Sequence, residues 1–342
     1  MNQAGISQAS MSQARLTLAE AEALVAAALQ RSNTSAGNAA IVARALVGAE
    51  ADGLKGHGLS RVPSYAAQAR IGKVDGFAIP SVEHVTPALM RIDAGFGFAY
   101  PALDAAIDAL KTAAPMMGIA AAAIRRSHHC GAAGHPVERL AEHGLVALLF
   151  ANTPAAMAPW GGNTGVFGTN PIAFACPLPD EAPIVVDLSL SKVARGNILA
   201  AKQKGPPIPD DWALDSDGKP TTSADAALKG TMVPLGDAKG TALALMVELL
   251  AAGLTGANYA ADASPFLDDK GPPPGTGQLI IAFDPKVVGG AGTLTHFHRL
   301  ADQIRAQEGA RLPGSRRMAL REQARTSGLA VAPALIEEIR AL

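Results

Sequence analysis

Short apolar runs, separated by Gly, Pro and Asn, constrain the fold of this chain most strongly. Stretches of this kind predict strands, and helical patterns at residues 101–113 and 135–143 lie between them. The middle of the chain is therefore predicted to be mixed α/β (α+β), a sheet with helices packed against it. The runs occupy residues 88–92, 118–124, 145–151, 171–176, 184–188 and 279–283.

Both ends of the chain carry helical patterns instead. Thr17 is a plausible N-cap, Glu20 completes a capping box, and a second helix follows at residues 38–52. We expect the helical tail to pack back on these N-terminal helices. The prediction is a helical domain formed by residues 1–84 plus 293–342 and a sheet domain at 85–292. The expected tail helices lie at 296–307, 318–327 and 333–342.

Two further segments have distinctive textures. Residues 236–254 are apolar nearly all round, which predicts a buried helix rather than a surface one. Residues 264–276 read as a surface loop.

Composition excludes several classes of protein. Charged residues make up 17% of the 342 residues, the net charge is −1 and only 4% are aromatic, so neither a nucleic acid nor a membrane surface is an expected partner. The apolar runs are far shorter than the roughly 20 residues that span a bilayer. Two cysteines give no disulfide framework, and no signal peptide is visible at the N-terminus, so a cytoplasmic location is expected.

Residues 127–135, with the sequence SHHCGAAGH, read as a functional site. Histidine exchanges protons near neutral pH, and small residues let a ligand approach the backbone. Adjacent histidines on a strand point to opposite faces and no zinc motif is present, so no metal is predicted. We expect His128 to be a hydrogen-bonded core histidine, Cys130 to be a buried small hydrophobe, and His129 to be functional.

The usual nucleotide motifs are missing. Gly95-Phe96-Gly97 has no third glycine, and Lys239 lacks the glycine spacing of a phosphate-binding loop. No Gly-x-Ser-x-Gly motif is present, which removes the hydrolase elbow.

Several motifs together nevertheless resemble the malate/L-lactate dehydrogenase-like family over residues 15 to about 285. The resemblance implies a non-Rossmann NAD(P) fold, which would explain the missing fingerprint, and a homodimer. It also implies that the sheet domain at 85–292 binds NAD(P) and that the helical domain serves substrate binding and dimerisation. Within the family, residues 254–259 and their surroundings look most like the Δ1-pyrroline-2-carboxylate/Δ1-piperideine-2-carboxylate reductases. The motifs are His57-Gly58 with Arg61, SHHCGAAGH, Pro159-Trp160-Gly161-Gly162, Gly168-Thr169-Asn170-Pro171, Val186-Asp187-Leu188-Ser189 and Ala238-Lys239-Gly240.

The resemblance also implies roles for individual residues. His57 matches the family's proton donor, with Asp187 as a second catalytic candidate, and Arg61 matches the ligand of the substrate carboxylate. His129 and Thr169 are expected to contact substrate. From spacing alone, His57 could equally be an exposed histidine on a glycine-flanked turn. Without the resemblance, Arg61 is better explained as a solvated surface arginine. The Thr169 segment is explained equally well as a turn.

The cofactor implied is NADPH, with NADH possible. Arg316 and Arg317 are candidates for its 2′-phosphate, although a solvated basic cluster is nearly as good a reading. Lys239 could reach a phosphate beside a helix N-terminus or be an ordinary solvated lysine. The full set of expected cofactor residues is His129, Cys130, Gly131, Ala132, Asp187, Leu188, Ser189, Lys239, Gly240, Gly314, Ser315 and Arg316.

Two positions depart from the family's pattern. Several members carry Ser before the catalytic His and Asp after the Ala-Arg-Gly run, forming a relay, whereas this chain has Gly56 and Asn197 there. An amide cannot stabilise an imidazolium by charge, so His57 would depend on water or Asp187.

The sequence hypothesis is an NADPH-dependent imino acid reductase, which converts Δ1-piperideine-2-carboxylate or Δ1-pyrroline-2-carboxylate to L-pipecolate or L-proline. A 2-oxo acid/2-hydroxy acid dehydrogenase of malate or lactate type needs the same proton donor and carboxylate clamp, so it stays open as an alternative. A non-catalytic ligand-binding relative is the alternative from another class.

Overall fold

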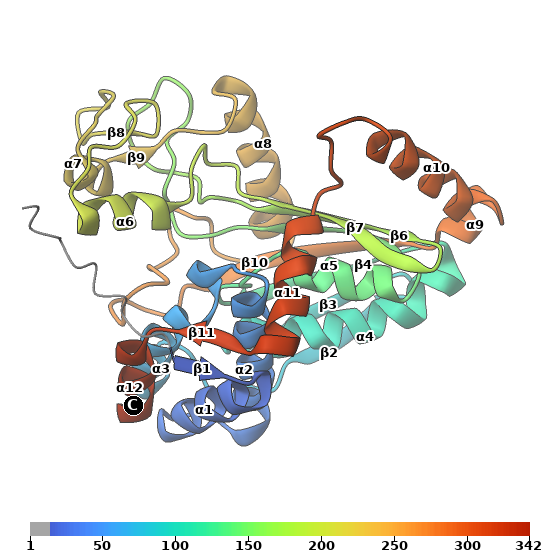
Figure 1. Cartoon of the computed structure of the whole chain (residues 1–342), viewed down its shortest axis with the longest axis horizontal. Helices are drawn as coiled ribbons and strands as arrows, with labels where there is room; N and C mark the ends of the chain where they lie inside the picture. Colours follow the sequence, from blue (N-terminus) through green and yellow to red (C-terminus); the bar gives the residue numbers. More distant parts are fainter. Residues whose placement is uncertain (1–13) are drawn as a thin grey trace, which may run out of the picture.

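A seven-stranded mixed sheet lies at the centre of the computed structural model, which describes residues 14–342 (Figure 1). Only the β3–β4 pair is parallel among its neighbouring strands. All six predicted runs are strands; β2 was not predicted, because its six residues are all exposed and present no apolar face. The strand order is β2 (Ser81–Thr86), β3 (Leu89–Asp93), β4 (Ile119–Ser127), β10 (Thr276–Phe283), β5 (Val146–Ala151), β6 (Ile172–Leu178) and β7 (Glu181–Leu188).

Helices cover both faces of this sheet. On one face, α4 (Ala99–Met117) packs against β3 and β4, and α5 (Gly134–Glu142) packs against β5, β6 and β7. On the other, the π-helix η3 (Leu249–Gly253) that follows α8 packs against β10. A smaller unit stands beside α8 and shares an apolar cluster with α8, η3 and one face of the central sheet (Figure 1). It contains α6 (Arg195–Lys204), β8 (Ala213–Leu214), α7 (Ala224–Lys229) and β9 (Thr231–Met232).

The two chain ends meet in the helical part of the molecule (Figure 1). Strand β1 (Ala14–Leu16) pairs antiparallel with β11 (Leu329–Val331), and Thr17 and Glu20 form the predicted capping box. As predicted, α12 packs against the N-terminal helices, and α11 joins them by packing against α2, whereas α10 packs against β6. The helices are α1 (Leu18–Arg31), α2 (Ala36–Ala51), α3 (Val62–Arg70), α9 (Pro285–Gly289), α10 (Thr293–Arg305), α11 (Ser315–Ser327) and α12 (Pro333–Ala341).

The expected burial of residues 236–254 is wrong. A helix does form there, α8 (Ala238–Glu248), but only one side of α8 and η3 meets the protein. A helix that is apolar all round can be buried on every side, but its sequence does not show how many sides are covered by other elements of the same chain. The exposed apolar side consists of Leu243, Leu245, Met246, Leu249 and Leu254. Within residues 14–342, no helix is both long and apolar enough to cross a bilayer.

Candidate active site

A cavity of about 260 Å³ brings together residues that the sequence analysis singled out separately. His57 enters it from the 3₁₀ turn η1 (Lys55–His57), and Asp187 and Ser189 enter from the end of β7. Gly314, just before α11, and Arg317 close it. Three segments far apart in the sequence therefore supply one concave site, which is typical of ligand pockets.

His57 is held in a neutral form and has an unused ring nitrogen. Burial, followed by the positive charges of Arg61 and His135, lowers the pKa of His57 to about 4. Its Nδ1 is buried and has no hydrogen-bond partner among the described residues. A buried polar atom without a partner costs stability, so its retention here points to a ligand or a reacting group as its partner.

The turn that carries His57 is fixed by Glu50 near the end of α2. Its carboxylate accepts a hydrogen bond of 3.0 Å from the Leu59 backbone N–H, at the start of η2 (Leu59–Arg61). A Cβ on Gly58 would lie 2.3 Å from Glu50 Oε2, so only glycine allows this approach. The motif His57-Gly58 therefore has a packing reason, and Arg61 follows on the same turn with its Nε donating to the Gly56 carbonyl.

His129 stacks on His57, with ring centroids 5.2 Å apart and an angle of 18° between the rings. Its Nδ1 lies 2.6 Å from the Tyr65 hydroxyl, which lies 3.2 Å from the Tyr100 hydroxyl. Burial raises the pKa of Tyr65 to about 12 and lowers the pKa of His129, so a neutral phenol and a neutral imidazole share this hydrogen bond, and the tautomer of His129 decides which of them donates.

His128 lies in the core, as expected. Its side chain is surrounded by Phe98, Phe266 and Tyr65, and its Nε2 lies 3.0 Å from the Gln68 Oε1. Burial lowers its pKa to about 3. Phe266 also packs on His129, so the segment 264–276, expected to be a surface loop, supplies part of the wall behind the site.

Two glycines let the backbone close in on the cavity. Gly131 has φ of +70°, and a Cβ there would lie 2.6 Å from the Tyr100 hydroxyl. Gly134 donates its N–H to Asp187 Oδ2 at 2.8 Å. The Asp187 side chain is accessible to solvent, but it lies in a concave site with many protein atoms around it. Partial loss of hydration in this site raises its pKa. No hydrogen bond joins Asp187 to His57 among the described residues, although both line the cavity.

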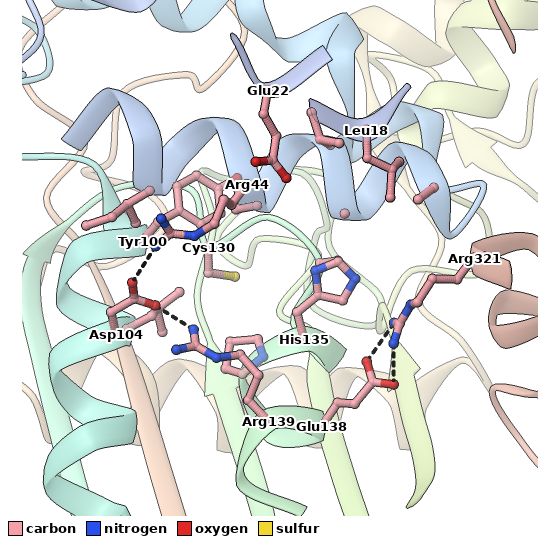
Figure 2. A pocket seen from close by; sticks show the side chains of 18 of the residues that line it. Leu18, Glu22, Arg44, Tyr100, Asp104, Cys130, His135, Glu138, Arg139 and Arg321 are labelled. Carbon is pink, nitrogen blue, oxygen red and sulfur yellow. Dashed lines mark hydrogen bonds and ion pairs between the residues drawn. The ribbon is translucent and has the colours of Figure 1, made fainter. Parts of the chain in front are cut away.

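Cys130 and Ala132 face a second, larger cavity of about 430 Å³ (Figure 2). Cys130 is 4% exposed, and burial raises the pKa of its thiol to about 12, so it is an unreactive small hydrophobe, as expected. The segment from His129 to His135 is thus the wall between two cavities.

The other predicted residues lie at different distances from the site. Thr169 is adjacent to it, since its carbonyl accepts from the Leu190 N–H at 2.8 Å and from the Ser189 hydroxyl at 3.4 Å. Gly240 approaches the backbone of Leu235 so closely that a Cβ would lie 1.9 Å from its oxygen. The remaining four are exposed and line neither cavity: Leu188, Lys239, Ser315 and Arg316.

A buried charge network joins the two cavities. Asp52 Oδ2 lies 2.8 Å from His135 Nε2 and 3.2 Å from Arg317 Nε, and both Asp52 and Glu138 accept hydrogen bonds from Arg321. Burial opposes ionisation of Asp52, but the bonds from Arg321 and His135 prevail and lower its pKa to about 2. Asp52, His135 and Glu138 have the spacing of metal ligands. Two guanidinium groups already neutralise these carboxylates, so they have no need of a cation.

Comparison with known proteins identifies the family. The family model described as malate/L-lactate dehydrogenase matches residues 16–340. The chain belongs to the malate/L-lactate dehydrogenase family. It is 52% identical over 303 residues to a (2R)-3-sulfolactate dehydrogenase (NADP(+)) of Chromohalobacter salexigens, covering 89% of this chain and 90% of that enzyme. It is 41% identical over 309 residues to a Δ1-pyrroline-2-carboxylate reductase of Ancylobacter novellus, with coverage of 89% and 90%.

A solved structure extends this similarity to the fold. The Δ1-piperideine-2-carboxylate reductase of Pseudomonas syringae superposes with a TM-score of 0.90 at 38% identity, covering 96% of this chain and 99% of that one. The malate/L-lactate dehydrogenase family resemblance and the fold class expected from the sequence are therefore confirmed. As a member, the chain is an oxidoreductase.

This family member differs from the relay pattern in its geometry as well as its sequence. Asn197 is exposed on α6, and no hydrogen bond joins it to an imidazole within residues 14–342. Gly56 is exposed, with open space where a Cβ would stand. Among residues 14–342, His57 therefore makes no contact with a charged relay partner at either position.

The sequence analysis missed the groups that support the candidate active site of this dehydrogenase-family chain. Tyr65 and Tyr100 are two of only three tyrosines in the chain, and both lie against the site. Their rarity was a usable signal, because a chain so poor in aromatic residues places them where a buried hydroxyl has a partner. Glu50 and Asp52 gave no comparable signal, since a helical carboxylate usually faces water.

Proposed function

We propose that this chain interconverts a small 2-oxo acid and its 2-hydroxy acid by NADPH-linked hydride transfer, with a sulfolactate-type substrate. The observation that carries the reaction class is the cavity in which an unpartnered His57 nitrogen meets Asp187 and Ser189. The 52% identity to a sulfolactate dehydrogenase supports this substrate over the others.

A bound nicotinamide cofactor would supply the hydride for reduction of the substrate at C2 and would accept it in the reverse direction. His57 handles the accompanying proton: it gives one to the substrate oxygen during reduction and takes one from the hydroxyl during oxidation. With its pKa lowered to about 4, a neutral His57 is ready to act as the base in the oxidation direction. For reduction, a substrate carboxylate beside Arg61 would offset one of the charges that lower this pKa.

The residues present fit a dinucleotide. Gly134 packs its backbone against Asp187, and Gly314 lies where β7 and α11 meet the cavity, so backbone without side chains borders the site. NADPH is preferred over NADH in this proposal because the relative at 52% identity is named for NADP(+). Arg316, exposed in the first turn of α11, is the proposed partner of its 2′-phosphate.

Reduction of a cyclic imino acid is the second candidate. It is supported by the pyrroline-2-carboxylate reductase at 41% identity and by the piperideine-2-carboxylate reductase structure. Protonation of an imine nitrogen would place the same demand on His57 as protonation of an oxygen, so the site geometry fits both substrates.

One assay separates these functions. NADPH and NADH oxidation would be followed with 3-sulfopyruvate, Δ1-piperideine-2-carboxylate, pyruvate and oxaloacetate, each at the same concentration. We expect the highest kcat/KM with 3-sulfopyruvate and NADPH. A kcat/KM at least tenfold higher with the imine would favour the second candidate instead. Cofactor binding without turnover of any substrate would contradict both candidates.

We further propose that the enzyme acts as a homodimer in the cytoplasm. The exposed apolar side of α8 and η3, from Leu243 to Leu254, is the proposed contact, since monomers rarely leave such a contiguous patch in water. Free Cys130 and Cys176 suit a reducing compartment. Light scattering of the protein and of a Leu249→Glu variant tests the contact: the variant should be a monomer, and an unchanged mass would place the interface elsewhere.

A further inference from the structure

The larger cavity is not explained by the oxidoreductase reaction. Its volume of about 430 Å³ lies within the range of small-molecule sites, and it opens between α1, α2, α4 and α5 (Figure 2). None of the proposed catalytic or substrate-binding residues lines it. Cys130 and Ala132, from the segment between the two cavities, face it.

Two guanidinium groups share one carboxylate at one end of this cavity. Asp104 of α4 lies 2.5 Å from Arg139 of α5 and 3.6 Å from Arg44 of α2. One carboxylate cannot accept from all the N–H groups of two arginines, so donors remain for a ligand. Figure 2 shows Asp104 between the two arginines at the edge of the cavity.

The opposite sign comes from α1. Glu22 points into the cavity from above (Figure 2), is half-buried, and makes no hydrogen bond or ion pair with any residue in the described range 14–342. The charges at the Arg321 end already balance each other, since Asp52 and Glu138 are matched by Arg317 and Arg321.

Glu142 of α5 also lines the cavity and has no partner among the described residues, and Arg325 lines it 3.7 Å from Glu322. The cavity therefore offers guanidinium donors beside Asp104 and free carboxylates at Glu22 and Glu142.

Much of the remaining lining is apolar. Leu18, Ile41, Ala45, Leu103 and Pro136 present hydrocarbon between the charged groups. A ligand that matches this surface carries a carboxylate, an ammonium and an aliphatic body.

We propose that this cavity binds a small aliphatic α-amino acid, with its carboxylate on Arg44 and Arg139, its ammonium on Glu22, and its side chain against Leu18, Ile41 and Leu103. The site is separate from the catalytic cavity and does not depend on which substrate the enzyme reduces. Charge-assisted bonds at both ends give it selectivity for the zwitterion over either charge alone.

Titration calorimetry on the full chain tests this with three matched probes. L-Leucine carries both charges, 3-methylbutylamine lacks the carboxylate, and 4-methylpentanoate lacks the ammonium. We expect L-leucine to bind at least about tenfold more tightly than either fragment, because each fragment loses one charge-assisted contact.

Variants locate the binding. Glu22→Gln and Arg44→Gln should each weaken L-leucine binding about tenfold or more. Glu83→Gln and Arg91→Gln, in an exposed ion pair on β2 and β3, should leave it unchanged. His57→Ala should also leave it unchanged, which separates this test from the proposed function.

Four results would overturn the proposal. Equal affinity for L-leucine and its fragments, or no binding of L-leucine or L-valine at millimolar concentration, would show that the charges do not select a zwitterion. Competition by NADPH would assign the cavity to the cofactor. Loss of L-leucine binding in His57→Ala with retention in Arg44→Gln would place the ligand in the catalytic cavity.

Discussion

The two cavities on either side of the segment from His129 to His135 are built in opposite ways. The smaller one contains an unpartnered imidazole nitrogen of His57 and is approached closely by glycine backbone. The larger one is lined by charged side chains, most of which already have partners within the fold. We expect the reaction in the smaller cavity, because a buried polar group without a partner is available to a substrate there. Cavity size alone would have favoured the larger cavity.

The largest expected effect separates the cavities by activity. His57→Ala should lower kcat about 10²- to 10⁴-fold, because the substrate heteroatom then exchanges its proton with water alone. Steady-state kinetics with the best substrate of the four-substrate assay measures this. Arg325→Ala, on the rim of the larger cavity, is the matched control and should change kcat by less than about twofold. Equal losses of kcat in both variants would show that catalysis is not confined to the smaller cavity.

The second effect concerns stability at the boundary between the cavities. Asp52→Asn leaves Arg317 and Arg321 with one carboxylate instead of two, and breaking a buried ion network costs about 3–5 kcal/mol. Asp104→Asn removes ion pairs whose arginine side chains are largely exposed, so it should cost about 0–1 kcal/mol. Denaturant unfolding measures both free energies. Similar values would mean that the buried network contributes no more than the exposed one.

A third test asks whether close backbone approach matters at the wall. Gly131→Ala and Gly72→Ala both place an alanine at positive φ, +70° and +76°, but only at Gly131 would the Cβ meet another group, the Tyr100 hydroxyl at 2.6 Å. The backbone strain is shared, so the difference in unfolding free energy isolates the steric clash, which we expect to be about 1–3 kcal/mol. A difference near zero would mean that Tyr100 moves aside freely.

The same contrast explains which parts could be predicted from the sequence. Periodic apolar runs gave the strands, and the Thr17 capping box gave the first helix, because both depend on neighbours in sequence. Strand β2 and the exposed side of α8 could not be predicted, because the exposure of each depends on which other elements of the fold pack against it. At the site, single side chains such as His57 were found by motif, while Glu50 and the Tyr65–Tyr100 pair were missed because they act across long separations in the chain.

The smallest expected effect comes from a histidine outside both cavities. Burial lowers the pKa of His128 to about 3, whereas in the unfolded chain it is about 6.5. Between these values the unfolded state binds a proton that the folded state does not, so stability falls as the pH falls, by about 1.4 kcal/mol per pH unit for each such group. His57 and His129 contribute to the same slope.

His128→Gln should therefore reduce the dependence of unfolding free energy on pH between about 6 and 5 by about 1 kcal/mol per pH unit. The slope is the readout, because the substitution also changes the level by removing packing against Phe98 and Phe266. His84→Gln, on exposed strand β2, is the control: it makes the same substitution where no buried packing is lost, and the slope should stay the same. An unchanged slope in the His128 variant would mean that acid opens the core around this histidine before it unfolds the chain.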